Sequence, residues 1–424
     1  MDSKRRTRTC EKTRRPRQET PRGCRQIVLP LDEETDRMLA ADRTEARAFV
    51  EEQARTYPEL FPSEMREHGF TFDGFERASR KQPGVRLRRL RVPGTNHVYT
   101  LRPSYLMPYL VGTVDELGYG LELLSHGVPP EIVARGCGHN AMFWYRVQEH
   151  LGRNSLAGTT LRASGQVPVD LAADEHHTTV NREKVFVSTT AAQGVILGLN
   201  LSMSADEVAL TETYGEFRRE ARNIQPDYSP KSVNTDGWPA TRNAWRKLFD
   251  GLTLILCFLH GFLKVYDRCR RQYQELKNRI WEVYRAASAA EFRQRMTELK
   301  TWCESQNLPP AVLTAVKKLF QHTNDYATSY SHPNGYRTSN QVDRLMNLRN
   351  RIIHAGRRLH GHLQSSEWRL RGWALMVNFR PFTQRHQYRC QWSSAAHRVN
   401  QKKTYHHHWL HNLNVSTSLA GFKA

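Results

Sequence analysis

The sequence predicts an α/β protein built on a mixed β-sheet that is flanked by helices. Short apolar strands alternate with amphipathic helices between residues 168 and 261, a pattern typical of such a sheet. Residues 262–335 carry only helical stripes of apolar residues, which indicates a helical insertion into the sheet domain. The first 160 residues are mainly helical and contain one hairpin signal.

The charge of the chain indicates a polyanionic partner. Lys and Arg total 63 against 42 Asp and Glu, which gives a net charge of +21. Because basic side chains that neutralise phosphates release counterions, nucleic acid is the expected partner. A merely basic, ribosomal-type protein is the alternative.

Nothing in the sequence indicates a membrane or an oxidising compartment. The longest apolar run, Leu252–Phe262, is too short to span a bilayer and is interrupted by His260 and Gly261. The N-terminus lacks the apolar core of a signal peptide. Seven scattered cysteines fit a reduced cytosol better than a disulfide framework.

Changes in composition divide the chain into segments. They are a basic arm at 1–25, a helical region with a hairpin at 26–103, a helix–turn–helix-like region at 104–160, a first core part at 168–261, the helical insertion at 262–335, a last core part at 336–382 and a basic C-terminal region at 383–424. The arm is too charged to fold alone; it either touches a nucleic acid backbone or only keeps the chain soluble. No element is predicted for 383–424.

The N-terminal half predicts a hairpin and a group of three helices. The hairpin joins residues 85–92 to 97–101, and its four arginines either lie on a solvated sheet face or follow phosphates. The helices are expected at 115–124, 131–135 and 139–151, with Met142, Phe143, Val147 and Leu151 as the apolar stripe of the third. If the group binds DNA, Arg146, Gln148 and Arg153 would face it. A purely structural helical domain is equally compatible with this pattern.

The order of elements after residue 167 resembles that of the ribonuclease-H-like fold. Strands are expected at 167–174, 184–190, 195–201, 232–235 and 252–258, and helices at 205–221 and 239–249. Apolar stripes at Leu276 and Ile280, at Phe292 and Met296, and at Val316 mark the helices of the insertion. The chain then returns in a helix over 338–353.

Three acids at the edges of these elements predict a metal site. Asp174 ends the first strand, Asp236 follows a later strand directly, and Asp343 lies beside the apolar stripe of the returning helix. Transfer of a phosphodiester needs two divalent ions about 4 Å apart, and Mg²⁺ prefers carboxylate and water oxygens. Each acid also has a structural alternative: a turn cap for Asp174, a helix N-cap for Asp236, and a solvated charge beside Arg344 for Asp343.

The spacing of further residues resembles bacterial insertion-sequence transposases of the DDE/DDD type. Asp236-Gly237-Trp238 is followed 21 residues later by Cys257-x-x-His260, and then by Ser339-Asn340-Gln341-Val342-Asp343. The Mutator-like group has the same Cys-x-x-His motif after its second acid and a helical insertion before its third. The third acid of these families is usually Glu, whereas this chain has Asp343.

The resemblance implies cleavage of DNA at element ends and transfer of the cut strand into target DNA. It implies Asp174, Asp236 and Asp343 as ligands of two magnesium ions, with manganese as a substitute, and double-stranded DNA as partner. It further implies a homodimer or higher assembly on DNA, in the bacterial cytoplasm at the nucleoid. Because Asp343 replaces Glu, a catalytically inactive, transposase-derived DNA-binding protein is the alternative. A nuclease of the same fold that acts on RNA–DNA hybrids or junctions is a third possibility.

Other side chains near the acids have expected roles in DNA binding or packing. Phosphate contacts are expected from Lys264, Arg268, Arg344, Arg349 and Arg351. Trp238 and Trp302 would stack on an unpaired base or pack in the core. Cys257 and His260 are too few for a structural zinc site, so packing and hydrogen bonding near the acids are expected. His406–His408 is expected to be a surface or DNA-facing cluster.

Overall fold

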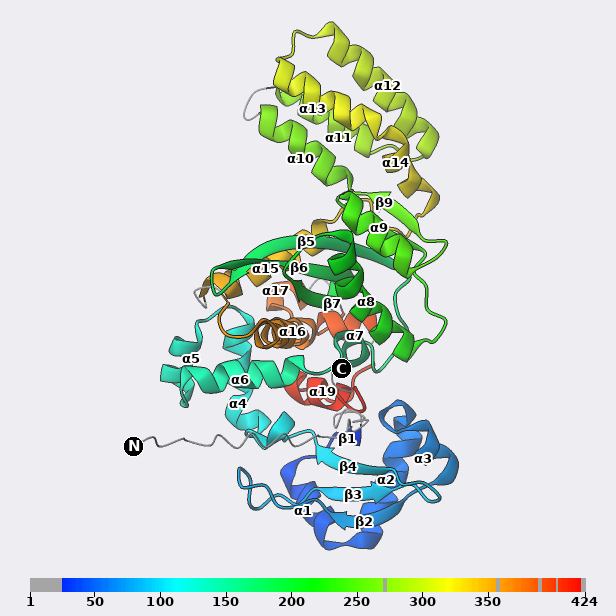
Figure 1. Cartoon of the computed structure of the whole chain (residues 1–424). Coiled ribbons are helices and arrows are strands. Elements are labelled where there is room, and N and C mark those ends of the chain that lie inside the picture. The colour runs from blue at the N-terminus through cyan, green and yellow to red at the C-terminus, as the bar shows by residue number, and fades with distance from the viewer. Residues whose placement is uncertain (1–24, 270–272, 356–358, 388–390, 402, 421–424) are drawn as a thin grey trace, which may run out of the picture.

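The computed structural model describes residues 25–269, 273–355, 359–387, 391–401 and 403–420, so nearly all of the basic arm lies outside the described residues. The protein is α/β with two mixed sheets. Figure 1 shows a small N-terminal sheet lobe at one end, the helical insertion at the other, and a larger sheet with its helices between them. Among the described residues, no helix is long and apolar enough to cross a membrane.

The N-terminal lobe has the helices expected over 26–82, and it also contains a four-stranded sheet that was not expected. Its elements are β1 (Gln26–Leu29), α1 (Glu33–Ala41), α2 (Arg43–Thr56), η2 (Pro58–Leu60), α3 (Ser63–His68), β2 (Thr71–Phe75), β3 (Arg88–Arg91), β4 (Val98–Pro103) and η3 (Pro108–Leu110). The strands lie in the order β1-β4-β3-β2, and β1 runs parallel to β4. The hairpin is present as β3–β4, and Arg89 and Arg91 both pair with the single carboxylate of Asp73 on a partly exposed sheet face.

The three expected helices are α4 (Val114–Ser125), α5 (Pro130–Cys137) and α6 (Ala141–Gly152). Helix α6 buries Trp144, Val147 and Leu151, whereas Met142, expected in this stripe, is 55% exposed. Gln148, expected to face DNA, is only 1% exposed because α6 packs against α16 (Leu363–Phe379). The expectation that Gln148 faces DNA is therefore wrong.

Two glycines allow α6 and α16 to approach closely. A Cβ at Gly152 would lie 1.7 Å from the Trp368 carbonyl oxygen, and one at Gly372 would lie 2.1 Å from the Gln148 carbonyl oxygen. Since backbone cannot yield as a side chain does, we expect Gly372→Ala to lower the free energy of unfolding by about 3 kcal/mol or more, measured by chemical denaturation. Gly136→Ala in α5 meets nothing within 4 Å, and it should be neutral or stabilise by up to about 1 kcal/mol. Equal effects of the two substitutions would contradict this packing.

The larger sheet has five strands in the order β7-β6-β5-β8-β9. Its elements are β5 (Asp170–Val180), β6 (Glu183–Ala192), β7 (Val195–Ser202), α8 (Glu207–Ile224), β8 (Ser232–Thr235), α9 (Pro239–Leu248) and β9 (Thr253–Leu256), preceded by α7 (Leu156–Thr160). Strands β5, β6 and β7 are antiparallel neighbours, whereas β5, β8 and β9 run parallel. The expected order of strands and helices is present, but β9 buries only Ile255 and is an edge strand rather than a buried one.

Alternation along β5 divides its side chains between two cores. Leu171 and Ala173 belong to the core that α8 and α9 cover, whereas Ala172 belongs to the core shared with α15 (Asn340–Ala355) and α16. Asp174 has the parity of Ala172 and so points toward α15, while Glu175 points toward α8 and α9. The sheet thereby fixes which helices meet each acid.

The insertion is a helical unit with a core of its own. It contains α10 (Phe258–Cys269), α11 (Gln274–Tyr284), α12 (Ala289–Ser305), α13 (Pro310–Gln321), α14 (Thr323–Ala327) and η4 (Thr328–Ser331). It leaves the sheet at the end of β9 and returns into α15 (Figure 1). The expected stripe residues Ile280, Met296 and Val316 are all buried in this core.

The C-terminal region, for which no element was predicted, is part of the packed body. It forms α17 (Gln384–Gln387), α18 (Ala395–Val399) and α19 (Trp409–Ser416). Beyond α19 the chain reaches the N-terminal lobe, where the Ser418 hydroxyl accepts a hydrogen bond from the Val28 backbone N–H at 3.0 Å. The two ends of the described chain are therefore held together.

Candidate metal centre

Asp174 lies inside a strand, not at its end. The expected strand stopped at Asp174, but β5 continues to Val180 because it pairs with β6 over its whole length. On its other side, the pairing of β5 with β8 reaches only Ala172. Asp174 thus stands just beyond the point where β8 ends, and it is 7% exposed.

Asp236 and Asp343 approach from a loop and a helix. Asp236 directly follows β8, and its Oδ1 accepts the Trp238 backbone N–H at 2.8 Å. The N-cap of α9 is Trp238, so Asp236 does not cap that helix. Gly237 has a φ of +90°, which favours glycine, and a Cβ there would lie 2.4 Å from Leu256 Cδ1.

Asp343 lies in the first turn of α15 rather than in solvent. Its Oδ2 accepts the hydroxyl of Ser339, the residue before the helix, at 3.0 Å.

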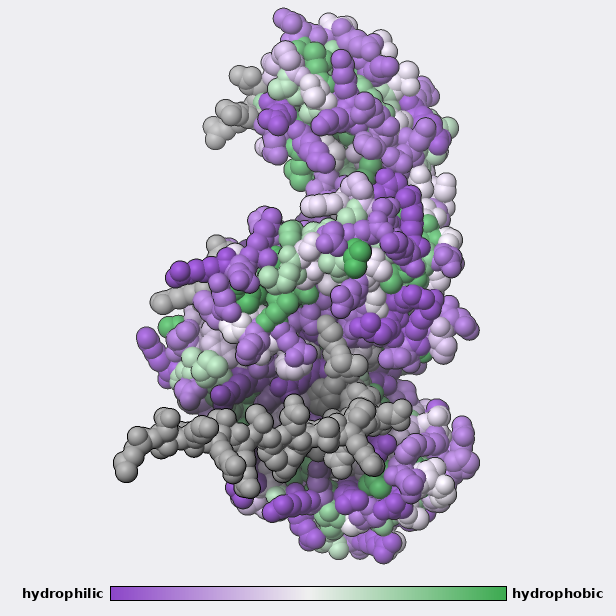
Figure 2. Space-filling view, viewed as in Figure 1, coloured by the Kyte–Doolittle hydropathy of each residue, from purple (hydrophilic) through white to green (hydrophobic). Residues whose placement is uncertain are grey.

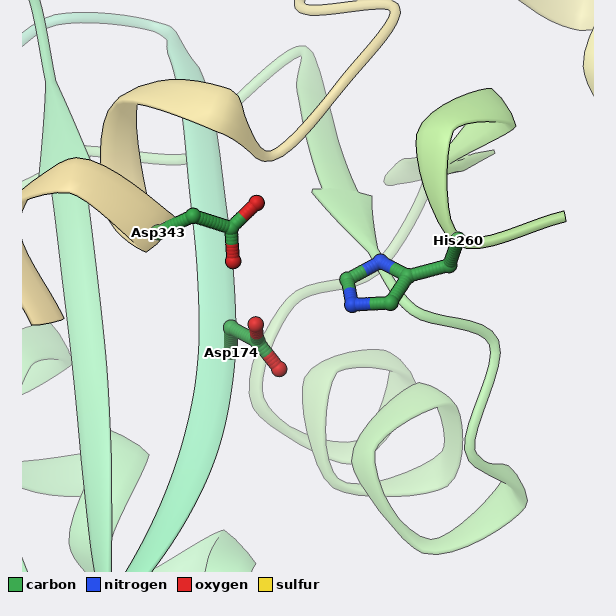
Figure 3. A group of neighbouring side chains, drawn as sticks. All are labelled: Asp174, His260 and Asp343. Carbon is green, nitrogen blue, oxygen red and sulfur yellow. The ribbon is translucent and has the colours of Figure 1, made fainter. Parts of the chain in front are cut away.

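The acids meet in two overlapping groups that share Asp174. Ligand atoms of Asp174, Glu175 and Asp236 all lie within 4.8 Å of one another, and so do those of Asp174, His260 and Asp343. Figure 3 shows the Asp174 and Asp343 carboxylates side by side, with the His260 ring opposite them. Two ligands of one octahedral ion lie about 3 to 4 Å apart, so each group needs only small movements to hold a cation.

Glu175 is a further candidate ligand that was not expected from the sequence. Its Oε1 accepts the Tyr214 hydroxyl at 2.5 Å and the Thr241 hydroxyl at 2.9 Å. These donors come from α8 and α9, on the opposite side of the sheet from α15. The adjacent pair Asp174-Glu175 was visible in the sequence, but two consecutive strand residues normally face opposite sides. The side chains of Asp174 and Glu175 both reach Asp236 because β8 ends at Thr235 and Asp236 lies just beyond that end.

The electrostatics of the site favour a bound cation. Burial raises the pKa of Asp174 to about 7, and the neighbouring carboxylates of Asp236 and Asp343 add to the shift. Burial likewise raises the pKa of Glu175 to about 7. Among the described residues, no Lys or Arg forms an ion pair with these four acids. The carboxylate oxygens of Asp174, Glu175 and Asp236 form an all-oxygen donor set that fits Mg²⁺ or Mn²⁺.

Cys257 and His260 form a hydrogen-bonded network with Ser339. The Ser339 backbone N–H donates to Cys257 Sγ at 3.2 Å, and its hydroxyl lies 3.5 Å from His260 Nδ1. The hydrogen bond with Cys257 raises the pKa of His260 to about 9, against the opposing effect of burial. Burial alone would raise the pKa of Cys257, but its hydrogen bonds with His260 and Ser339 outweigh burial and lower it. Cys257 and His260 thus form hydrogen bonds beside the acids, as expected.

A basic cleft of about 770 Å³ adjoins Asp236. It lies between the insertion and the sheet, where the surface of the molecule is indented (Figure 2). Its walls combine the start of α9 with α10 and α13, and its basic side chains are Arg242, Lys264, Arg268 and Lys318. Lys264 and Arg268 were expected at phosphates, whereas Arg242 and Lys318 were not.

The remaining expected DNA contacts differ in accessibility. Trp238 is 47% exposed at the mouth of the cleft, and Arg344 is exposed on α15. Arg349 is only 1% exposed, because it lies on the packed stripe of α15, so the expectation that it contacts phosphate is wrong in this structure. Trp302 is half-buried under the Arg279 guanidinium, whose centre lies 4.7 Å from the ring.

The His406–His408 run does not join the acids. The His406 and His411 rings stack at 4.4 Å, and burial lowers the pKa of His411 to about 4. His407 is exposed, whereas His406 and His408 are half-buried. Within the described part of the chain, these histidines are not among the groups that could hold a metal ion.

The raised pKa of Asp174 predicts a pH-dependent stability in the absence of divalent cations. A carboxyl whose folded pKa is raised stabilises the fold fully below its unfolded pKa of about 4, and this contribution is lost as pH rises through about 7. Asp174→Asn cannot titrate. We therefore compare the free energy of unfolding of Asp174→Asn with that of the unaltered protein, both in EDTA. This difference should shift in favour of the variant by about 2–3 kcal/mol between pH 5 and pH 8. A difference independent of pH would show that Asp174 is not desolvated.

Comparison with known proteins adds no assignment: no protein-family model matches the chain, and no curated protein matches it.

Proposed function

We propose that the protein is a DNA transposase of the DDD type with a ribonuclease-H-like core. The observation that carries the proposal is that ligand atoms of Asp236, after β8, and of Asp343, on α15, each lie within 4.8 Å of those of Asp174 on β5. The strand order β7-β6-β5-β8-β9, in which the antiparallel strands β6 and β7 extend the three parallel strands β5, β8 and β9, supports the fold assignment. The Cys257-x-x-His260 motif and the helical insertion support the likeness to the Mutator-like group.

Asp174, Asp236 and Asp343 would hold the divalent ions, with Glu175 beside them. Bound magnesium would supply the positive charge that stabilises the phosphoryl oxygens during attack and departure. The protein's own part is to hold the four carboxylates on rigid elements. Hydrogen bonds from Tyr214, Thr241, Ser339 and the Trp238 backbone fix Glu175, Asp343 and Asp236, and Asp174 accepts the Glu175 backbone N–H. The short side chain of Asp343 suffices here because α15 begins beside β5.

Double-stranded DNA is the proposed substrate and target. The basic cleft opens beside Asp236, so its four cationic side chains would hold the backbone of a strand whose phosphate reaches the acids. The net charge of +21 is consistent with such a partner. Transfer into target DNA brings two element ends together, each with a bound copy of the chain. A homodimer or higher assembly on DNA therefore belongs to the proposal.

A strand-cleavage experiment tests the proposal. The full-length protein is incubated with a plasmid that carries its gene and several hundred base pairs of native flanking DNA, with Mg²⁺, Mn²⁺ or EDTA. We expect divalent-ion-dependent nicks with 3′-hydroxyl ends at two discrete flanking positions, and their joining to a second plasmid. Binding without nicks would favour the inactive DNA-binding derivative, and preferential cutting of an RNA–DNA hybrid would favour a nuclease.

A further inference from the structure

The two groups of potential ligands around Asp174 differ in chemistry. Asp174, Glu175 and Asp236 offer oxygen alone, whereas Asp174, His260 and Asp343 offer two oxygens and a ring nitrogen. Carboxylates suit Mg²⁺ and Mn²⁺ alike, but an imidazole nitrogen favours transition-metal ions over Mg²⁺. A difference in donor atoms would therefore give the two positions different preferences for cations.

The His260 ring is held in the orientation that a metal ligand needs. Its Nδ1 lies 3.5 Å from the Ser339 hydroxyl, and it shares a hydrogen bond with Cys257. Figure 3 shows the nitrogen-bearing edge of the ring turned toward Asp174 and Asp343. Histidines that bind metals usually have such outer partners, which fix the ring and its tautomer.

Ser339 links the two members of the mixed group. Its hydroxyl donates to Asp343 at 3.0 Å and contacts His260, while its backbone N–H donates to Cys257. Ser339 and Cys257 are both buried, so solvent does not loosen the arrangement. The Cys257-x-x-His260 spacing places Cys257 directly after β9 and the His260 imidazole in the first turn of α10.

We propose that Asp174, Asp343 and His260 form a nitrogen-containing cation position that prefers Mn²⁺ to Mg²⁺, beside an all-oxygen position at Asp174, Glu175 and Asp236 that accepts either ion. The inference rests on the proposed function, because it assigns cations to the same site. It gives His260 a direct ligand role in place of packing alone.

Electron spin-echo spectroscopy of Mn²⁺ bound to the full-length protein tests the inference without an activity assay. We expect ¹⁴N modulation from a coordinated imidazole, which His260→Gln abolishes and which the exposed-site variant His68→Gln retains. In calorimetric titrations with Mn²⁺, His260→Gln should weaken one of two binding steps at least about tenfold and leave the other unchanged. In a titration with Mg²⁺, the Mn²⁺ that shows no ¹⁴N modulation should be displaced at lower Mg²⁺ concentrations than the Mn²⁺ that shows it.

The outcomes separate this inference from the proposed function. If Mn²⁺ binds in a way that requires Asp174 but shows no nitrogen coupling, His260 is only a neighbouring charge, and the inference is overturned while the metal site stands. If nitrogen coupling persists in His260→Gln, the ligand is another histidine, and the inference is again overturned. If Mn²⁺ does not bind at all, both the inference and the proposed function fail.

Discussion

Asp236→Asn is expected to abolish strand cleavage and transfer while DNA binding persists. Asp236 forms a group of three potential cation ligands with Asp174 and Glu175. The substitution removes the negative charge of one of these three carboxylates. A divalent ion contributes several kcal/mol to the stabilisation of phosphoryl transfer, so the rate should fall about 10³-fold or more. The measurement is single-turnover cleavage of end-labelled DNA in Mg²⁺, with binding followed separately by fluorescence anisotropy.

The fold should tolerate this substitution. Asn keeps the oxygen that accepts the Trp238 backbone N–H, so the turn into α9 is preserved. Asp250→Asn, an exposed acid in the turn after α9, is the matched control and should leave the cleavage rate unchanged. Cleavage by Asp236→Asn within tenfold of the unaltered protein would remove Asp236 from the catalytic site.

Replacing Lys264, Arg268 and Lys318 together with alanine is expected to weaken DNA binding on the order of 10²-fold at 0.1 M salt. Each phosphate contact contributes a slope of about 0.9 in the dependence of log affinity on log salt, so the slope should fall by about 2.7. All three side chains are exposed and line the cleft beside Asp236. The measurement is the DNA affinity between 0.05 and 0.3 M salt.

Lys300 and Lys317 provide matched controls for the cleft. Both are exposed lysines of the insertion, on α12 and α13, and neither lines the cleft. Their joint replacement with alanine should change the salt slope far less than the cleft variant does. Equal losses from both variants would mean that the DNA follows the general charge of the insertion rather than the cleft.

Local patterns in the sequence were sufficient for the elements that carry the acids. The strand at Ser232–Thr235 and the start of the helix at Pro239 are as expected, and for the helix a proline at the first turn is a local signal. Asp236, at the junction of these two elements, could therefore be located from the sequence. The length of β5 could not, since it depends on pairing with β6.

Features that depend on long-range contacts were not predictable. Strand β1 is only four residues long and pairs with β4 more than 70 positions away, so no local pattern distinguishes it from a loop. Arg349 has the same charge as Arg344, and only the packing of α15 buries the first and exposes the second. Lys318 joins the cleft because α13 folds back over α10.

Anomalous diffraction from crystals of the full-length protein soaked in Mn²⁺ tests most directly whether Asp174, Asp236 and Asp343 jointly bind the catalytic cations. We expect manganese peaks about 2.2 Å from Asp174 carboxylate oxygens, one shared with Asp236 and one with Asp343. Asp174→Asn crystals treated in the same way should lose both peaks. Manganese absent from Asp174, or bound only at sites away from the three acids, would contradict the account.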